Sequence, residues 1–308
     1  LNRLCGSGLQ AVVSAAEQIL LGNCDIALAG GAESMSRAGH LLTQSRRGQK
    51  MGDVVATDMM LGALTDPFGN GHMGVTAENI AKRGNIDRAA QDAFAVESHR
   101  RAARAIAEGR FKDQILPMTV RQGRTEVTFD TDEHVRPGLT DADLAKLRPV
   151  FAKDGSVTAG NASGINDGAA ALVLMEAETA TARGITPLAR IVAYGLGGVA
   201  PEVMGLGPVP ASRQALERAG LQVSDLDVVE SNEAFAAQAC AVSADLALPT
   251  NKVNPNGGAV ALGHPVGASG AIILTKLLYE LERIDGRYGL ATMCIGGGQG
   301  IAVIVERG

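Results

Sequence analysis

Gly263-His-Pro-Val-Gly-Ala-Ser-Gly270 is the stretch that decides how the fold is interpreted. It precedes a segment, 271–281, in which apolar residues recur at helical spacing. An apolar run at 289–294 and three glycines at 296–298 come next. This order predicts a buried helix that leads into a buried strand and then into a glycine-rich turn.

The same plan occurs at the start of the chain. Cys-Gly-Ser-Gly at 5–8 is followed by a helical pattern over 9–20 and by an apolar run over 25–31. Both copies place Ser-Gly at the start of the helix, at 7–8 and at 269–270. Two glycine-rich helix starts can match by chance, and a duplication within the chain is the alternative.

A duplication would also define the boundaries between domains. The second copy would begin near 187, where 188–194 has the pattern of a first strand. Roughly 75–80 residues then precede its glycine-rich turn, so we expect a similar segment to be missing before Leu1. The predicted domains are 1–36, the remainder of the first half; 37–165, an irregular loop domain with one strong helix near 87–108; 166–186, the end of the first half; and 187–308, the second half.

Composition supports a layered α/β protein. The chain has 308 residues with 46% hydrophobic side chains, enough to bury one large core or two smaller ones. Thirty-nine glycines, no Trp and only 3% aromatic residues suit closely packed helices and tight strand–helix turns. An all-β sandwich is therefore a poor fit.

Charge and cysteine content exclude several functional classes. The net charge of −5 and the lack of long Lys/Arg runs argue against a nucleic-acid surface. No stretch approaches the roughly 20 apolar residues that span a bilayer. The four cysteines form no CxxC pair and no Cys/His spacing typical of zinc, so we expect neither disulfides nor a metal. A reducing cytoplasm is the expected location.

Four residues with reactive or polar side chains stand at the ends of predicted elements. Cys5 begins a helix, where free N–H groups and the helix dipole favour a thiolate, although a free Cys is also commonly a small buried hydrophobe. His264 lies in a narrow turn between glycines, and Cys294 ends a strand before a glycine-rich turn that can bind an anion. Asn232 follows the apolar strand 226–229. The helix start gives Cys5 the environment of a nucleophile, whereas a lone His such as His264 is more often structural.

Six separated motifs in order make the chain similar to the thiolase family over its whole length. They are Cys-Gly-Ser-Gly (5–8), Gly-His-Met-Gly (71–74), Gly-Asn-Ala-Ser-Gly (160–164), Asn-Glu-Ala-Phe (232–235), Gly-His-Pro-Val-Gly-Ala-Ser-Gly (263–270) and Cys-Ile-Gly-Gly-Gly (294–298). The likeness is greatest to the bacterial biosynthetic acetoacetyl-CoA thiolases. It implies two duplicated βαβαβαββ halves in a layered α/β/α/β/α arrangement, an inserted loop domain, and a homotetramer joined by an arm within 34–67.

The resemblance also implies an activity, an acetyl-CoA C-acetyltransferase that reversibly condenses two acetyl-CoA to acetoacetyl-CoA and CoA. Cys5 would take the acetyl group, with His264 accepting the thiol proton. Cys294 would take a proton from the second acetyl-CoA. His264 and a water held by Asn232 would stabilise the enolate, and the N–H groups of Cys5 and Gly296 the tetrahedral intermediate.

Coenzyme A thioesters would be the substrates, with no further cofactor. The family positions that would contact them, including Met73 and Met204 as limits on acyl length, are Ser163, His72, Met73, Arg136, Leu64, Leu147, Phe151, Ala159, Ala234, Phe235 and Met204. Of these, Leu147, Phe151 and Arg136 would meet the adenine end.

Three alternatives can be named. A ketoacyl synthase would use a second histidine where this chain has Asn232, and the presence of Cys294 favours a thiolase. A broad-specificity degradative 3-ketoacyl-CoA thiolase remains the nearest rival. A noncatalytic, lipid-binding or structural remnant is disfavoured because all four catalytic side chains are present.

Overall fold

The computed structural model describes residues 1–308, and its second half is built on a four-stranded sheet. The strand order is β7 (Arg190–Gly198), β10 (Gln299–Glu306), β9 (Tyr288–Ile295) and β8 (Val228–Ser231). β10 runs antiparallel to both neighbours, whereas β8 and β9 are parallel. The predicted strands at 188–194, 226–229 and 289–294 are therefore confirmed as β7, β8 and β9.

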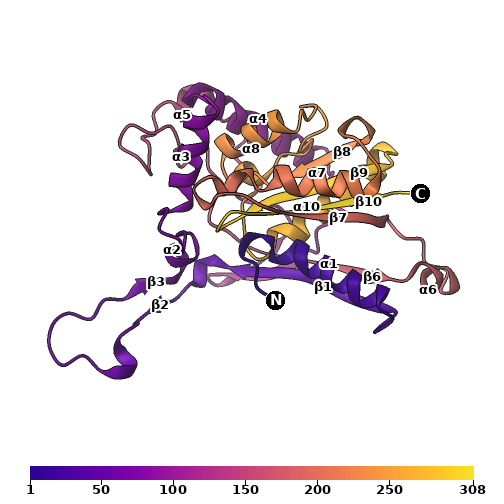
Figure 1. Ribbon diagram of the computed structural model, residues 1–308, viewed down its shortest axis with the longest axis horizontal. Coiled ribbons are helices and arrows are strands. Elements are labelled where there is room, and N and C mark those ends of the chain that lie inside the picture. Colours follow the sequence, from indigo (N-terminus) through magenta and orange to yellow (C-terminus); the bar gives the residue numbers. More distant parts are fainter.

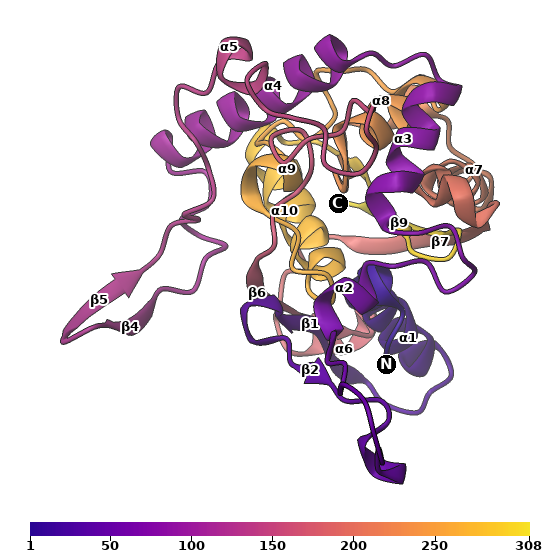
Figure 2. The same ribbon diagram turned by 90° about the vertical axis from the view of Figure 1, so that its left-hand side faces the viewer.

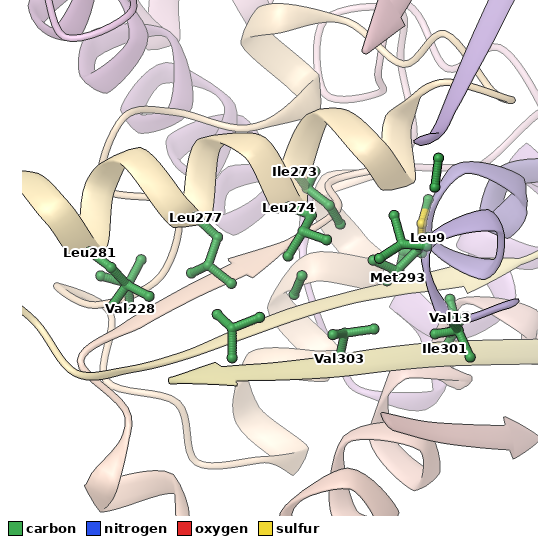
Figure 3. Close-up of a cluster of buried hydrophobic side chains, with 14 of the residues drawn as sticks. Leu9, Val13, Val228, Ile273, Leu274, Leu277, Leu281, Met293, Ile301 and Val303 are labelled. Atoms are coloured by element: carbon green, nitrogen blue, oxygen red, sulfur yellow. The ribbon is translucent and has the colours of Figure 1, made fainter. Parts of the chain in front are cut away.

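Side chains alternate between the two faces of this sheet, and each face has its own core. Ile301, Val303 and Val305 of β10 pack into a cluster with α1 (Ser7–Leu20) and α10 (Ser269–Ile284). Ala302 and Ile304 pack on the other face, beneath α7 (Pro208–Ala219) and α8 (Ala236–Asp245). Figure 3 shows the first cluster between α10 and the sheet. A central strand buried on both faces explains the continuous apolar sequence of β10.

A second sheet lies on the other side of α1 and α10. β1 (Ile26–Ser34) pairs antiparallel with β6 (Asp167–Met175), so the apolar runs on either side of the loop domain meet. Figure 1 shows the order of layers as sheet β1/β6, helices α1 and α10, sheet β7/β10/β9/β8, and helices α7 and α8. Four layers of the implied five-layer thiolase fold thus lie within residues 1–308.

The two central helices cross with their backbones in contact. A Cβ added to Gly8 would lie 2.7 Å from the backbone nitrogen of Ala271, and one added to Gly270 would lie 2.3 Å from that of Leu9. Only glycine allows this approach. The Ser-Gly pairs that the sequence places at matching positions are thus in contact at the start of α1 and α10.

The loop domain lies over one end of the layers and sends two extensions away from the body (Figures 1 and 2). One is the loop between the short strands β2 and β3, and the other is the β4–β5 hairpin. The elements of this domain are β2 (His40–Leu41), β3 (Thr57–Asp58), α2 (Met59–Ala63), α3 (Met73–Arg83), α4 (Arg88–Ala107), β4 (Met118–Gln122), β5 (Thr125–Phe129) and α5 (Asp141–Leu144). The helix predicted near 87–108 is confirmed as α4, which Asp87 caps by accepting from Ala90 N at 2.8 Å.

Short elements complete the chain. They are the helices α6 (Ala177–Ala182) and α9 (Ala259–Leu262) and the 3₁₀ turns η1 (Leu4–Gly6), η2 (Met35–Arg37), η3 (Ser45–Arg47), η4 (Pro201–Leu206) and η5 (Val223–Asp225). An exposed connection, 183–188, joins α6 to β7 and so links the two halves. None of the helices combines the length and apolar composition that crossing a membrane requires.

Candidate active site

Cys5 lies in η1, where the chain enters α1. The residue before it, Leu4, has φ 50°, a left-handed conformation that is uncommon outside glycine. The backbone N–H groups of Cys5 and Gly296 lower the pKa of the Cys5 thiol. Burial has the larger effect, and with the charge of Glu33 it raises the pKa of Cys5 to about 11. Desolvation thus outweighs the N–H groups at this helix start, so Cys5 is a thiol at rest and needs a base to react.

Cys294 brings a second sulfur to the same place. It lies one residue before the end of β9 and is 1% exposed. Its neighbours Met293 and Ile295 point into the core beneath α1 and α10, so the pleat of the strand directs Cys294 to the opposite face. Burial, followed by the nearby Cys5, raises the pKa of Cys294. Both thiols are therefore protonated in the resting site.

Asn232 and His264 form a polar pair within the second half. Asn232 follows β8, and its backbone N–H donates to Thr292 O on β9 at 3.0 Å, which ties it to the strand that carries Cys294. Asn232 Nδ2 lies 3.4 Å from His264 Nε2. The carbonyl Oδ1 of Asn232 is buried and has no protein partner, so it is free to accept a hydrogen bond within the site.

The proton on His264 can be assigned from its neighbour Ser269. The Ser269 hydroxyl donates to Pro265 O at 2.9 Å and lies 2.6 Å from His264 Nδ1. Because a hydroxyl has one hydrogen, Nδ1–H must donate to Ser269 Oγ, which leaves Nε2 with its lone pair. Burial lowers the pKa of His264 to about 4, so the imidazole is neutral and Nε2 is a base.

An apolar wall extends from Cys294. Seven buried residues form it, namely Met73, Ala77, Val157, Met204, Ala234, Phe235 and Cys294. The His72 ring stacks on Phe151 with centroids 4.7 Å apart, and the edge of Phe151 meets Phe235 at 6.1 Å. Ser163 Oγ donates to Ala234 O at 2.9 Å. The structure thus brings six of the positions implied for CoA together with Cys294, and Phe151, assigned to the adenine end, lies with them.

The remaining implied positions lie outside this wall. Leu64 is half-buried, and its carbonyl accepts from Met73 N at 2.8 Å. Leu147 and Ala159 are exposed on loops, with the Leu147 side chain directly against Gly160. Arg136 is also exposed, and its backbone N–H donates to His99 Nδ1 at 3.1 Å.

Sequence reasoning missed the residues that hold the catalytic side chains in place. Ser269 orients His264, and Asn166 Oδ1 accepts from the backbone N–H of His264 at 3.2 Å. Glu233 and Asn254 flank Asn232 with buried hydrogen bonds. The position of Glu233 next to Asn232 could have predicted its role from the sequence. Asn166 lies 98 residues from His264, so no sequence pattern links the two.

Comparisons with known proteins agree with this geometry. The family model "Thiolase, N-terminal domain" matches residues 1–178, and "Thiolase, C-terminal domain" matches 185–307. The chain is 64% identical to beta-ketothiolase BktB of Cupriavidus necator over 99% of the chain and 78% of that protein. It is 55% identical to an acetyl-CoA acetyltransferase of Shinella zoogloeoides over the same shares.

Solved structures give the same result. The acetyl-CoA acetyltransferase of Bacillus anthracis superposes with a TM-score of 0.97 at 48% identity, covering 100% of this chain and 78% of that one. Human mitochondrial 3-ketoacyl-CoA thiolase superposes with a TM-score of 0.98 at 46% identity and the same coverage.

Proposed function

The chain belongs to the thiolase family, and we infer that it is an acetyl-CoA C-acetyltransferase that reversibly condenses two acetyl-CoA to acetoacetyl-CoA and CoA. One observation carries the mechanism. The backbone N–H groups of Cys5 and Gly296 lower the pKa of the half-buried Cys5 thiol, and the buried Cys294 thiol lies near enough for Cys5 to raise its pKa. A nucleophile beside an oxyanion site, with a second acid–base group next to it, is what two successive acyl-transfer steps require.

In the first step, Cys5 is acetylated. The thiol is protonated at rest, so His264 Nε2 takes its proton as the sulfur attacks the acetyl carbonyl. The N–H groups of Cys5 and Gly296 stabilise the oxyanion of the tetrahedral intermediate. CoA leaves as a thiolate and takes the proton of Cys294. This exchange leaves an acetyl-cysteine, a Cys294 thiolate and a protonated His264.

In the second step, the new base forms the carbon–carbon bond. The Cys294 thiolate takes a proton from the methyl group of a second acetyl-CoA. Nε2–H of His264 and a water held by Asn232 Oδ1 stabilise the enolate oxygen. The enolate carbon attacks the acetyl group, Cys5 leaves as a thiolate and recovers its proton from His264. All three groups return to their resting protonation states, and thiolysis reverses the sequence.

Further properties follow from the same proposal. CoA thioesters bind along the apolar wall, and the thiols and imidazole carry every step without another cofactor. Because both cysteines must be reduced to react, the cytoplasm is a suitable location. A homotetramer would form through the exposed loop between β2 and β3, in which Met51 and Val55 are 92% and 73% exposed.

Broad 3-ketoacyl-CoA thiolysis is the second candidate, because the relative at 64% identity is called a beta-ketothiolase. The position of Met73 bears on this choice. A Cβ added to Gly296 would lie 3.5 Å from Met73 Sδ, so this side chain borders the oxyanion site, where its size can limit the acyl chain. The kcat/KM ratio for four-carbon and longer 3-ketoacyl-CoA substrates separates the candidates.

Substitution of each cysteine tests the assigned roles. Cys5→Ala removes the atom that is acetylated, so acetyl transfer and condensation should both be lost. Cys294→Ala keeps the nucleophile, so radiolabelled acetyl-CoA should still label Cys5 while condensation falls by about 10²–10⁴-fold. Peptide mapping of the label and an acetoacetyl-CoA assay should be run in parallel. Label on Cys294 in the Cys5→Ala protein, or parental condensation by Cys294→Ala, would contradict the assignment.

A further inference from the structure

The side chain of Asn232 is poorly fixed by its own contacts. Its Nδ2 has one long approach of 3.4 Å to His264, and its Oδ1 has no protein partner. A group that stabilises developing charge must nevertheless be held to within about 0.5 Å. The backbone on either side of Asn232 must therefore supply its position.

Glu233, the next residue, bridges three segments of the chain. Its Oε2 accepts from Ser98 Oγ on α4 at 2.6 Å and from Val260 N on α9 at 3.2 Å. Its Oε1 accepts from Asn254 Nδ2 at 2.8 Å. Since α9 ends two residues before His264, the carboxylate connects the Asn232 backbone directly to the segment that carries the imidazole.

Asn254 holds both neighbours of Asn232. Its Oδ1 accepts from Ser231 N at 2.9 Å, and its Nδ2 donates to Ser231 O at 2.8 Å as well as to Glu233. The residue adopts φ 44°, a left-handed conformation that asparagine tolerates better than most residues. The residues before and after Asn232 are thus bound to one side chain.

A second connection runs in parallel. Lys276 Nζ donates to Glu230 Oε2 at 2.7 Å and to Gly257 O at 2.6 Å. Glu230 lies two residues before Asn232, and Gly257 belongs to the same segment as Asn254. The space is filled, since a Cβ added to Gly258 would lie 2.2 Å from Glu233 Cδ. These contacts leave little freedom between the two backbones.

We propose that Glu233, together with Asn254, is a positioning residue that sets Asn232 relative to His264 for enolate stabilisation. Neither side chain touches the reacting atoms. Both act through the backbone of Asn232 and the segment 254–263. The inference rests on the proposed function, in which Asn232 serves the condensation step.

A double-mutant cycle tests the inference. Asn232→Ala should lower condensation kcat by about 10²-fold. Glu233→Gln keeps the volume but presents an amide N–H₂ to donors that need an acceptor, so kcat should fall by about 10–100-fold with the KM for acetyl-CoA unchanged within about twofold. Because Glu233 acts through Asn232, the double variant should be no slower than Asn232→Ala alone.

Asn254→Gly provides a second route, since glycine keeps the left-handed backbone and loses only the side-chain bonds. It should show the same non-additivity with Asn232→Ala. Asn85→Gly is the matched control, because Asn85 also has a left-handed φ of 49° but lies exposed between α3 and α4. Its kinetics should equal those of the parent.

The outcomes separate the proposed function from the positioning role. A parent that makes no acetoacetyl-CoA, or an Asn232→Ala variant with parental turnover, would overturn the proposed function. If the parent makes acetoacetyl-CoA and Asn232→Ala is slower than the parent, but the Glu233→Gln and Asn232→Ala losses multiply in the double variant, the positioning role is wrong. Should Glu233→Gln fail to fold by circular dichroism, Asn254→Gly decides by the same criterion.

Discussion

At the scale of single residues, every reacting group of this site is uncharged at rest. Burial raises the pKa values of Cys5 and Cys294 and lowers that of His264. The motifs identified these side chains but not the strength of their desolvation, which comes from segments far away in the sequence. Charge therefore develops only during turnover, where the N–H groups of Cys5 and Gly296 can stabilise it.

The lowered pKa of His264 predicts that the rate of Cys5 acetylation changes little at acidic pH. An ordinary histidine with a pKa of 6.5 would be about 90% protonated at pH 5.5 and acetylation of Cys5 would fall about tenfold. With its pKa lowered to about 4, His264 should stay neutral, and the acetylation rate at pH 5.5 should remain within about twofold of that at pH 7. Rapid-quench measurement of the first turnover provides the check.

The free energy of unfolding, unlike the acetylation rate, should depend on pH through His264 below about pH 6.5. The imidazole of His264 takes up a proton near pH 6.5 in the unfolded chain but only near pH 4 in the folded chain. Its contribution to the free energy of unfolding is therefore complete above pH 6.5 and is lost as the pH falls from 6.5 to 4. His264→Asn should flatten that part of a denaturant-unfolding profile. An acetylation rate that titrates near pH 6.5 would show that the pKa of His264 is not lowered in the folded protein.

At the scale of elements, the crossing of α1 and α10 places the nucleophile. Each helix presents a glycine to the other, and the N-terminal end of α10 carries Ser269, which orients His264. The crossing therefore couples the position of Cys5 to that of the imidazole. Apolar side chains fill the space between the crossing and the four-stranded sheet, among them Leu9, Val13, Ile273 and Leu277 (Figure 3).

Gly270→Ala should disrupt this crossing. The added methyl group would lie 2.3 Å from Leu9 N, a backbone atom that cannot move without displacing α1. We expect a loss of about 3 kcal/mol in the free energy of unfolding and a large loss of acetylation. Gly62→Ala is the control, since Gly62 is an exposed helical glycine at which an added Cβ would meet no atom within 4 Å, and it should be neutral or slightly stabilising. Equal unfolding midpoints for the two variants would contradict the close packing.

The elements differ in how well sequence predicts them. Periodicity located α1, α10, β1 and β9, because each has a long apolar pattern that packing enforces, whereas α4 was predicted from the glycine that ends it, Gly109. The β4–β5 hairpin escaped prediction, since all ten of its strand residues are exposed and no buried face imposes a pattern. The Glu233–Asn254 contacts escaped because hydrogen bonds between distant segments leave no periodic signal.

At the scale of the whole molecule, the site forms where three regions meet. The first half supplies Cys5, the second supplies Asn232, His264 and Cys294, and the loop domain adds His72 and Met73 to the wall. The motifs predicted these contributions, but only the fold shows that Phe151 joins the wall instead of standing apart from it. The loop domain thus covers a site that the two halves build.

The extension between β2 and β3 should control assembly. Its residues 42–56 are exposed and project from the body (Figure 1). Replacing 43–56 with a short Gly-Ser turn should halve the mass of the homotetramer proposed above, with kcat retained within about threefold, because the catalytic groups lie elsewhere. Light scattering gives the mass. A Gly-Ser replacement of the β4–β5 turn, 123–124, is the control, and an unchanged mass after shortening 43–56 would exclude this loop as the contact.

The exposed connection at 183–188 gives the division of the catalytic groups a practical consequence. A gene cut there would encode two pieces, one holding the nucleophile and the other holding the amide, imidazole and second thiol. Neither piece contains a working set, and they also share one hydrophobic core. The pair would behave as a logic gate, in which acetoacetyl-CoA is produced only when both pieces meet. Fused to two other proteins, they would report the association of those proteins as an enzymatic signal.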